Sequence, residues 1–392
     1  MNIAGIIAEY NPFHRGHALQ IELLRQAGYD AVVCVISPGV VQRGSLAVFP
    51  SEVRAKAAIE GGADLVLSLP APFALCSAEG FAAAGVQILS ALGNVNTLNF
   101  GMEASDVKDI VATATLLLSD EYKTELKASL ANGASYASAA AAAAGKLLPS
   151  AEDILREPNN ILAVEYCKAI IRQKSKLVPT GLTRVTAQHD EKLSNKDIAS
   201  ASAVRLLLKK DAESARQYVP INCMPIYEQA IKDGLIIDNK SFSVAVLSRL
   251  RAMSKEQIFS VRNINEGLEH RLYTAIQSAG DIDSLYSALK CKRYAHARMR
   301  RLVLDAALGY TKALDINVPY IHILAANKRG LEVLSSAKST LAISQSLAKL
   351  SATSSDAKAV AIAHCAAEDL AALCMRSPQP MGQSFTTKMY KK

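Results

Sequence analysis

Residues 1–105 alternate short apolar runs with helical patterns, and this alternation limits the possible fold more than any other feature. The runs are rich in isoleucine, valine and leucine and are bounded by turn residues, which predicts buried strands. They lie at residues 3–8, 30–37, 64–69 and 95–100. Strands that alternate with helices form parallel sheets covered on both faces. We therefore expect an α/β, Rossmann-like domain whose ligands bind beyond the carboxyl ends of the strands.

Two histidines lie where the first predicted strand gives way to the first helix. The turn EYNPF at residues 9–13 ends the strand, and His14-Arg15-Gly16-His17 then opens an amphipathic helix. Three positions apart at a helix start, His14 and His17 project to the same side, and Gly16 lets a ligand approach the backbone. The N–H groups and the positive dipole end of the helix favour a phosphate. Two imidazoles beside them would stabilise charge on an α-phosphate during nucleotidyl transfer.

The alternative interpretation is an ordinary helix start with two satisfied histidines. It does not explain why both histidines cluster at one strand end, since the whole chain has only seven. A bare His-x-Gly-His pattern is short and recurs by chance. The motif becomes specific through its setting of strand, turn and helix.

The longer string EYNPFHRGH at residues 9–17 carries a family resemblance. It resembles the signature of the HIGH-type nucleotidyltransferases and, over its full length, that of the bacterial tRNA(Met) cytidine acetate ligases. The resemblance implies that ATP and acetate form acetyl-adenylate and pyrophosphate. The acetyl group then passes to the N4 amine of the wobble cytidine of elongator tRNA(Met). Acetate and this tRNA follow from the resemblance alone, whereas the residues themselves indicate nucleotidyl transfer and suit an RNA partner. Mg²⁺ is expected with ATP, although no dedicated carboxylate cluster is visible.

The resemblance also assigns the residues of the active site. The expected catalytic residues are His14 and His17, which stabilise the α-phosphate, and Arg205, which holds the outgoing phosphates. The expected ATP contacts are Ile7, Ala8, Glu9, Tyr10, Asn11, Pro12, Phe13, Gly16, Gln20, Gly101, Asn159, Arg184, Ser200 and Ser202.

The expected ATP contacts after residue 100 lie at predicted strand ends and helix starts. Gly101 ends the fourth run, and Arg184 ends a fifth strand candidate at residues 176–184. Asn159 follows a proline before an apolar periodic stretch, which predicts an asparagine N-cap, and capping alone explains it. A serine-rich element at residues 198–205 resembles the part that closes such sites, although an ordinary capped helix has the same pattern.

A loop at residues 37–44 follows the second predicted strand. The family pattern there is Ser-Gly-Asn-Phe-Val-Gln-Arg-Gly, and this chain departs from it at Pro38-Gly39-Val40. The resemblance implies substrate contacts for Gln42 and Arg43, and for Arg54 in the next helix. Taken alone, the loop is a surface turn and Arg54 a solvated helix charge.

From about residue 215 helical patterns take over. We expect a nucleotidyltransferase-like catalytic domain at residues 1–214 and a mainly helical, basic, tRNA-binding domain at residues 215–392. The densest basic run, residues 292–301, supplies Arg293, Arg298 and Arg301 as expected RNA contacts. A solvated helix face is the alternative for such a run. The tail at residues 376–392 is polar and expected to be frayed.

The composition of the chain indicates the kind of partner and the cellular compartment. Lys plus Arg exceeds Asp plus Glu by 44 to 36, a net charge of +8 that suits a polyanionic partner. The seven cysteines form no CxxC pair, which argues against a disulfide framework or structural zinc and for a reducing compartment. No signal peptide or membrane span is evident, so we expect a cytoplasmic protein with no membrane partner.

Two other functions fit parts of the pattern. One is a small-metabolite adenylyltransferase without an RNA partner, which does not need the basic helical half. The other is a non-catalytic RNA-binding protein, which does not need the complete histidine motif. ATP–pyrophosphate exchange separates the two catalytic functions from the binding one, and the dependence of that exchange on a particular acid separates the two enzymes.

Overall fold

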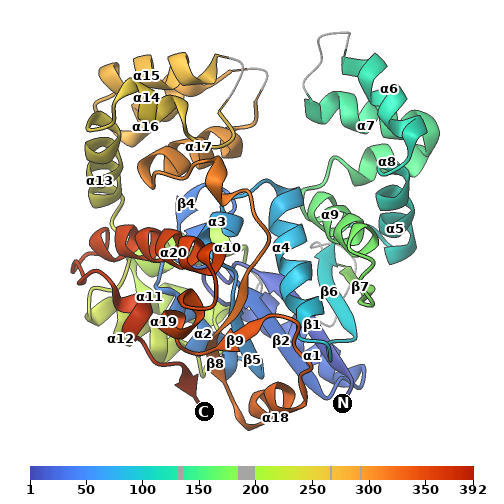
Figure 1. Cartoon of the computed structure of the whole chain (residues 1–392). Helices are drawn as coiled ribbons and strands as arrows, with labels where there is room; N and C mark the ends of the chain where they lie inside the picture. Colours follow the sequence, from blue (N-terminus) through green and yellow to red (C-terminus); the bar gives the residue numbers. More distant parts are fainter. Residues whose placement is uncertain (131–135, 184–198, 265–266, 292–293) are drawn as a thin grey trace.

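The computed structural model describes residues 1–130, 136–183, 199–264, 267–291 and 294–392. One large sheet forms its centre, with the strand order β10-β8-β5-β2-β1-β6-β7 and β9 beside β8 (Figure 1). The strands predicted in the first half are β1 (Ile3–Ala8), β2 (Ala31–Ile36), β5 (Leu65–Ser68), β6 (Thr97–Met102) and β7 (Val178–Thr183). These five strands pair in parallel with one another, so their carboxyl ends share one edge. The predicted α/β fold is confirmed.

Alternation along β1 shows that both faces of the sheet are covered. Ile3 and Ile7 join a core with the residues of α4 and α9, whereas Ala4 and Ile6 join a second core with α1 and α2. Successive strand residues point to opposite faces, so an apolar residue at every position requires helices on both sides. The helices that cover the sheet are α1 (Arg15–Gln26), α2 (Ser51–Glu60), α4 (Ala78–Ala91) and α9 (Pro158–Arg172).

Short elements fill the connections in the first half. A two-stranded hairpin follows β2, and a group of helices drawn in green stands to one side above the sheet (Figure 1). These elements are β3 (Val40–Val41), β4 (Ser45–Leu46), α3 (Ala71–Ala74), α5 (Val107–Leu116), α6 (Asp120–Leu130), α7 (Tyr136–Leu147) and α8 (Pro149–Ile154).

The second half is mainly helical, as the sequence predicts. In Figure 1 its helices α13–α17 stand on the other side above the sheet, across from α5–α8. The helices are α10 (Ala201–Lys210), α11 (Ala212–Ala215), α12 (Met224–Lys232), α13 (Asn239–Arg251), α14 (Lys255–Phe259), α15 (Leu268–Ser278), α16 (Ile282–Leu289), α17 (His296–Ala307), α18 (Lys328–Ser336), α19 (Leu347–Ser351), α20 (Ser355–Leu373) and α21 (Gln383–Thr386), with 3-10 turns at Arg216–Tyr218 and Lys312–Leu314.

The second half also returns to the central sheet, which the sequence patterns did not predict. β8 (Tyr320–Ala326) lies antiparallel to β5, and β9 (Ala342–Ser344) and β10 (Tyr390–Lys391) both pair with β8. The two halves therefore share one sheet. A division of roles near residue 214 stays a prediction.

The tail at residues 376–392 was expected to be frayed, but its end is held by hydrogen bonds and an ion pair. Tyr390 donates a hydrogen bond to the Glu60 carboxylate at 2.8 Å, and Lys392 pairs with the same group at 2.7 Å. All seven cysteines lie among the described residues, and none forms a disulfide. Within the described ranges, no helix has both the length and the apolar character that crossing a membrane requires.

Candidate active site

His14 and His17 form the start of α1, directly after the turn that ends β1. His14 is the N-cap residue, and its Nδ1 accepts a hydrogen bond from the Gly16 N–H at 3.0 Å. The N–H of His14 in turn donates to Nδ1 of His17 at 3.3 Å. The two rings stack with their centroids 3.9 Å apart and their planes 27° from parallel. The prediction that both side chains project to one side is confirmed.

These capping bonds decide which nitrogen of each ring can serve a ligand. Both Nδ1 atoms accept backbone hydrogen bonds, so each neutral imidazole carries its proton on Nε2. Two Nε2–H groups side by side suit phosphate oxygens. The backbone offers less than the sequence suggests, because the Gly16 N–H is used by His14 and the His17 N–H donates to the His14 carbonyl at 2.9 Å. Phosphate binding here would depend on the rings and the helix dipole.

Tyr10 and Phe13 are buried against the His17 ring. Their ring centroids lie 4.7 Å and 5.6 Å from that of His17, and 4.9 Å from each other. The Tyr227 hydroxyl from α12 donates to the Phe13 carbonyl at 3.0 Å, and this bond helps to hold the turn in place. Burial raises the pKa of Tyr10 well above its ordinary value. Both aromatic side chains hold the histidine pair in place, so an ATP contact at either position would come from the backbone.

The other predicted contacts near the turn also contribute mainly backbone. The side chains of Ile7 and Pro12 are buried and that of Ala8 is half-buried. Asn11 is buried as well, and its side-chain oxygen accepts a hydrogen bond from the Val48 N–H at 2.8 Å. These residues shape the floor of the site at the carboxyl end of β1.

Glu9 connects the turn to the loop at residues 37–44. Its carboxylate accepts a hydrogen bond from the Gln42 N–H at 3.0 Å. Burial raises the pKa of Glu9, against the opposing pull of the nearby Arg43, the Gln42 hydrogen bond, Arg205 and Arg54. Arg43 itself is exposed. The structure thus brings Gln42 and Arg43 close to Glu9 at the end of β1.

Arg54 is held among backbone carbonyls, and its expected substrate contact stays a prediction. It is fully buried, and its guanidinium donates to three carbonyls: Phe49 at 3.0 Å, Glu9 at 2.7 Å and Pro38 at 2.6 Å. Burial lowers its pKa, while Glu368, Glu52 and Glu9 oppose this. Arg54 positions the turn and the loop, and its side chain is not accessible to RNA. The sequence could not distinguish it from a solvated helix charge.

Arg205 closes the site from α10. Its NH1 donates to the Asn11 carbonyl at 2.7 Å, and its NH2 donates to the Ser202 hydroxyl at 2.8 Å. Ser200 is the N-cap of α10, and its hydroxyl accepts from the Ala203 N–H at 3.2 Å. The structure therefore brings Arg205 and Ser202 to the histidine turn, whereas the Ser200 hydroxyl is used by the helix.

Hydrogen bonds join the end of β6 to the start of α9. Asn159 and the Asn160 N–H both donate to the Glu103 carboxylate, the latter at 3.0 Å. The Asn160 side chain accepts from two backbone N–H groups after Gly101, at 2.8 Å and 3.0 Å. The predicted asparagine N-cap is wrong, because Glu157 is the N-cap and Pro158 occupies the first turn. Sequence reasoning missed Glu103 and Asn160, and only the pairing of a carboxylate with a nearby helix start could have indicated them.

Gln20 reaches the sheet edge from α1. Its side-chain N–H donates to the Asn99 oxygen at 2.8 Å, and Asn99 donates to the Thr180 hydroxyl at 3.0 Å. This polar chain joins α1 to β6 and β7. It places Gln20 beside Asn99 on β6.

The basic run lies on and before α17. The NH1 of Arg301 donates to the Gln42 carbonyl at 3.1 Å, and the Arg298 guanidinium lies 4.1 Å from the centroid of the Tyr294 ring. Arg184 and Arg293 lie outside the described residues, so their predicted contacts stay predictions.

The residues present fit a nucleotide. In addition to the histidines and Arg205, the site has the Ser37 hydroxyl at the carboxyl end of β2. This hydroxyl is buried and has no hydrogen-bond partner among the described residues. A buried hydroxyl of this kind indicates a missing partner such as a ligand oxygen. The described ranges contain no group of three or more metal-ligating side chains.

Comparisons with known proteins cover the whole chain. Residues 1–384 match the family described as HIGH Nucleotidyl Transferase. The tRNA(Met) cytidine acetate ligase of Acetivibrio thermocellus is 34% identical, with 98% of this chain and 99% of the relative covered. That of Clostridium acetobutylicum is also 34% identical, with 88% and 89% covered. A crystal structure of Thermotoga maritima TmcAL bound with alpha-thio ATP is 26% identical, with a TM-score of 0.92 over 100% of both chains.

Proposed function

The chain belongs to the HIGH nucleotidyl transferase family and, within it, to the tRNA(Met) cytidine acetate ligases, and on this premise we propose its reaction. It is an ATP-dependent ligase. A carboxylate oxygen of acetate attacks the α-phosphorus of ATP, the bond to the β-phosphate breaks, and pyrophosphate leaves. The N4 amine of the wobble cytidine of elongator tRNA(Met) then attacks the acetyl carbonyl of the adenylate. AMP leaves, and the amine loses a proton.

The stacked histidine pair is the observation that carries this proposal. Charge builds on the oxygens of the α-phosphate as acetate attacks, and donors placed there in advance stabilise the transition state. His14 and His17 supply two Nε2–H donors whose orientation is fixed by their own Nδ1 bonds. A protein that only binds RNA does not need such a pair.

The other residues take supporting roles in the same site. Arg205 and Arg43 would hold the phosphates that leave, since both lie near Glu9 at the end of β1. Gly101, Gln20 and Asn159 would face the nucleoside, with the Glu103 carboxylate setting the position of Asn159.

Mg²⁺ would bind together with ATP. It would neutralise part of the charge on the phosphates, and the phosphate oxygens would supply most of its ligands. The part of the chain that the structure describes has no acidic cluster of its own for the ion.

The experiment is acetate-dependent ATP–pyrophosphate exchange. Its variants separate the loss of the imidazole from the loss of the helix cap. His17→Ala removes both the imidazole and the cap. His17→Gln keeps a hydrogen-bond acceptor at the third helical position, where glutamine is a natural capping-box residue, and removes only the imidazole. His270→Ala is the control, because His270 is an exposed histidine on α15.

Exchange should need acetate and should fall about 100-fold or more in both His17 variants, the loss expected for one preorganised donor. Only His17→Ala should also melt at a lower temperature. Labelled acetate should then appear in tRNA(Met). Exchange with another small acid and no transfer to RNA would instead indicate a small-metabolite adenylyltransferase, and no exchange at all would refute the ligase.

A further inference from the structure

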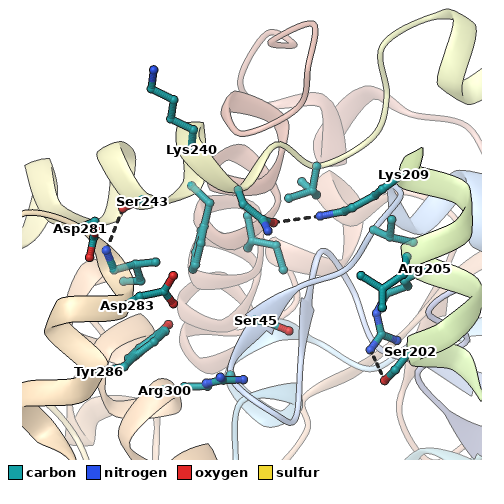
Figure 2. Close-up of a pocket in the computed structure, with 18 residues that line it drawn as sticks. Ser45, Ser202, Arg205, Lys209, Lys240, Ser243, Asp281, Asp283, Tyr286 and Arg300 are labelled. Carbon is teal, nitrogen blue, oxygen red and sulfur yellow. Dashed lines mark hydrogen bonds between the residues drawn. The ribbon is translucent and has the colours of Figure 1, made fainter. Parts of the chain in front are cut away.

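A cleft of about 640 Å³ lies between α10 and α13 and is closed by the β3–β4 hairpin, α16 and α17 (Figure 2). Its volume is in the range of about 300–1,000 Å³ that is typical of sites for small ligands or single groups of larger ones. Leu46, Ile237 and Phe242 give it a buried apolar floor. Its rim carries most of the labelled polar side chains in Figure 2. An apolar floor with a charged rim suits a ligand that has both a flat apolar part and a charged part.

The charge of the rim favours an anion. Four cationic and two acidic side chains line the cleft, and these are Arg205, Lys209, Lys240, Arg300, Asp281 and Asp283. The Asp281 carboxylate is already used, because it caps α16 by accepting the Ser284 N–H at 2.7 Å. Lys240 and Arg300 are exposed. Phosphates of a nucleic-acid backbone match this arrangement.

Tyr286 offers a contact for a base. The Arg300 guanidinium lies 5.3 Å from the centroid of its ring, so a cation and an aromatic surface stand together in the cleft. The Tyr286 hydroxyl is buried and has no hydrogen-bond partner among the described residues. Burial raises the pKa of Tyr286, so the hydroxyl stays protonated and can donate. Aromatic and arginine side chains of this kind stack on unpaired bases.

The cleft adjoins the active site through a shared wall. Arg205 and Ser202 line the cleft at one end (Figure 2). The same Arg205 donates to the Asn11 carbonyl in the turn before the histidines. A nucleotide in the cleft therefore lies next to the place where the adenylate would form.

We propose that this cleft binds single-stranded RNA of the anticodon loop, beside the wobble cytidine that is modified. The base rests on Tyr286 and Arg300, and Lys240 contacts the backbone phosphate. This inference rests on the proposed function, and it changes the expected RNA contacts. On α17 the side chain that opens onto the cleft is Arg300, whereas Arg301 is bonded to the Gln42 carbonyl.

The test is binding of an unmodified tRNA(Met) transcript, measured without ATP at several salt concentrations. Lys240→Ala should weaken binding and lower the slope of log affinity against log salt by about one. Lys358→Ala is the matched control, because Lys358 is exposed on α20 and does not line the cleft. Tyr286→Phe should weaken binding roughly threefold to tenfold, the effect of one hydrogen bond, without lowering the melting temperature.

Unchanged affinity and slope in Lys240→Ala and Tyr286→Phe would overturn the inference, as would an equal loss in Lys358→Ala. A wild-type protein that does not bind the transcript would also overturn it. Acetate-dependent exchange by the wild type, measured without RNA, tests the proposed function separately. Loss of that exchange together with the expected binding changes would leave the cleft assigned to RNA and refute only the ligase chemistry.

Discussion

Gly39 is the middle of the three residues at which this chain departs from the family pattern, and the structure predicts that a larger residue there is destabilising. The N–H of Gly39 donates to the Glu368 carboxylate of α20 at 3.0 Å. A Cβ added to Gly39 would lie 2.8 Å from the Ala371 Cβ and 2.8 Å from a Glu368 oxygen. The carboxylate can rotate away, but the Ala371 methyl group is fixed to the helix backbone. The loop or α20 must therefore shift.

The expected size follows from two opposing effects. Forced overpacking costs about 1–3 kcal/mol, while replacing a glycine by alanine restricts the unfolded chain and gains about 0.4–1 kcal/mol. Gly39→Ala should therefore lower the free energy of unfolding by about 1–2 kcal/mol. Gly39→Asn, which restores the family residue, should destabilise at least as much. Gly280→Ala is the control, because no atom lies within 4 Å of its added Cβ and its φ is not positive. That control should be stabilised by about 0.4–1 kcal/mol.

Thermal and urea unfolding followed by far-ultraviolet circular dichroism are the assays, since the chain has no tryptophan. A double variant makes the test specific. Ala371→Gly alone should cost about 1 kcal/mol in the helix. Combined with Gly39→Ala it should be less destabilising than the sum, because it removes one of the two clashing methyl groups. A Gly39→Ala protein as stable as the Gly280→Ala control, or strict additivity in the double variant, would refute this packing argument.

Three further predictions follow from buried polar groups. Arg262 and Asp305 form an ion pair of 2.7 Å whose side chains are 2% and 1% exposed, so Arg262→Met should cost about 3–5 kcal/mol in thermal melts, and adding Asp305→Leu should recover much of it. Burial and the neighbouring Glu368 raise the pKa of Glu52 from 4.5 to about 7, so the folded state binds a proton that the unfolded chain has lost. The free energy of unfolding should therefore be highest below about pH 4.5 for this group and fall as pH rises to about 7, and Glu52→Gln should flatten that slope in melts across the range. Asn160→Ala leaves two backbone N–H groups after β6 without their acceptor, so it should lower the free energy of unfolding by about 1–3 kcal/mol and raise KM for ATP in exchange assays. Unchanged stability and KM would contradict the role of Asn160 in joining β6 to α9.

The sequence predicted the elements whose signals are local. Each parallel strand of the first half has its own apolar run and its own turn, so β1, β2, β5, β6 and β7 could be placed before any contact was known. β8 has an apolar run too, but its place depends on pairing with β5, which precedes it by more than 250 residues. β10 is only Tyr390–Lys391, and its order depends on Glu60. No local pattern carries such information.

The same limit applied within the site. The spacing of His14 and His17 at a helix start was enough to predict that their rings lie together. The role of Arg54 depends on burial among three carbonyls that come from three separate segments, and sequence spacing does not show this. Pro38 and Gly39 could be recognised as a departure from the family, but the helix that contacts Gly39 lies more than 300 residues away in the sequence.

The loop at residues 37–44 is the place where these separate segments meet. From the second half, α20 holds it at Gly39 through Glu368, and Arg301 of α17 bonds to the Gln42 carbonyl. Gly44 lies so close to α17 that an added Cβ would be 2.6 Å from the Arg300 Cβ. From the first half, the Glu9 carboxylate holds the Gln42 N–H beside the histidine turn. The loop therefore links the turn that would form the adenylate to the helix that would contact RNA. The loop is therefore held from both halves of the chain, by Glu9 and Arg54 of the first and by Glu368 and Arg301 of the second.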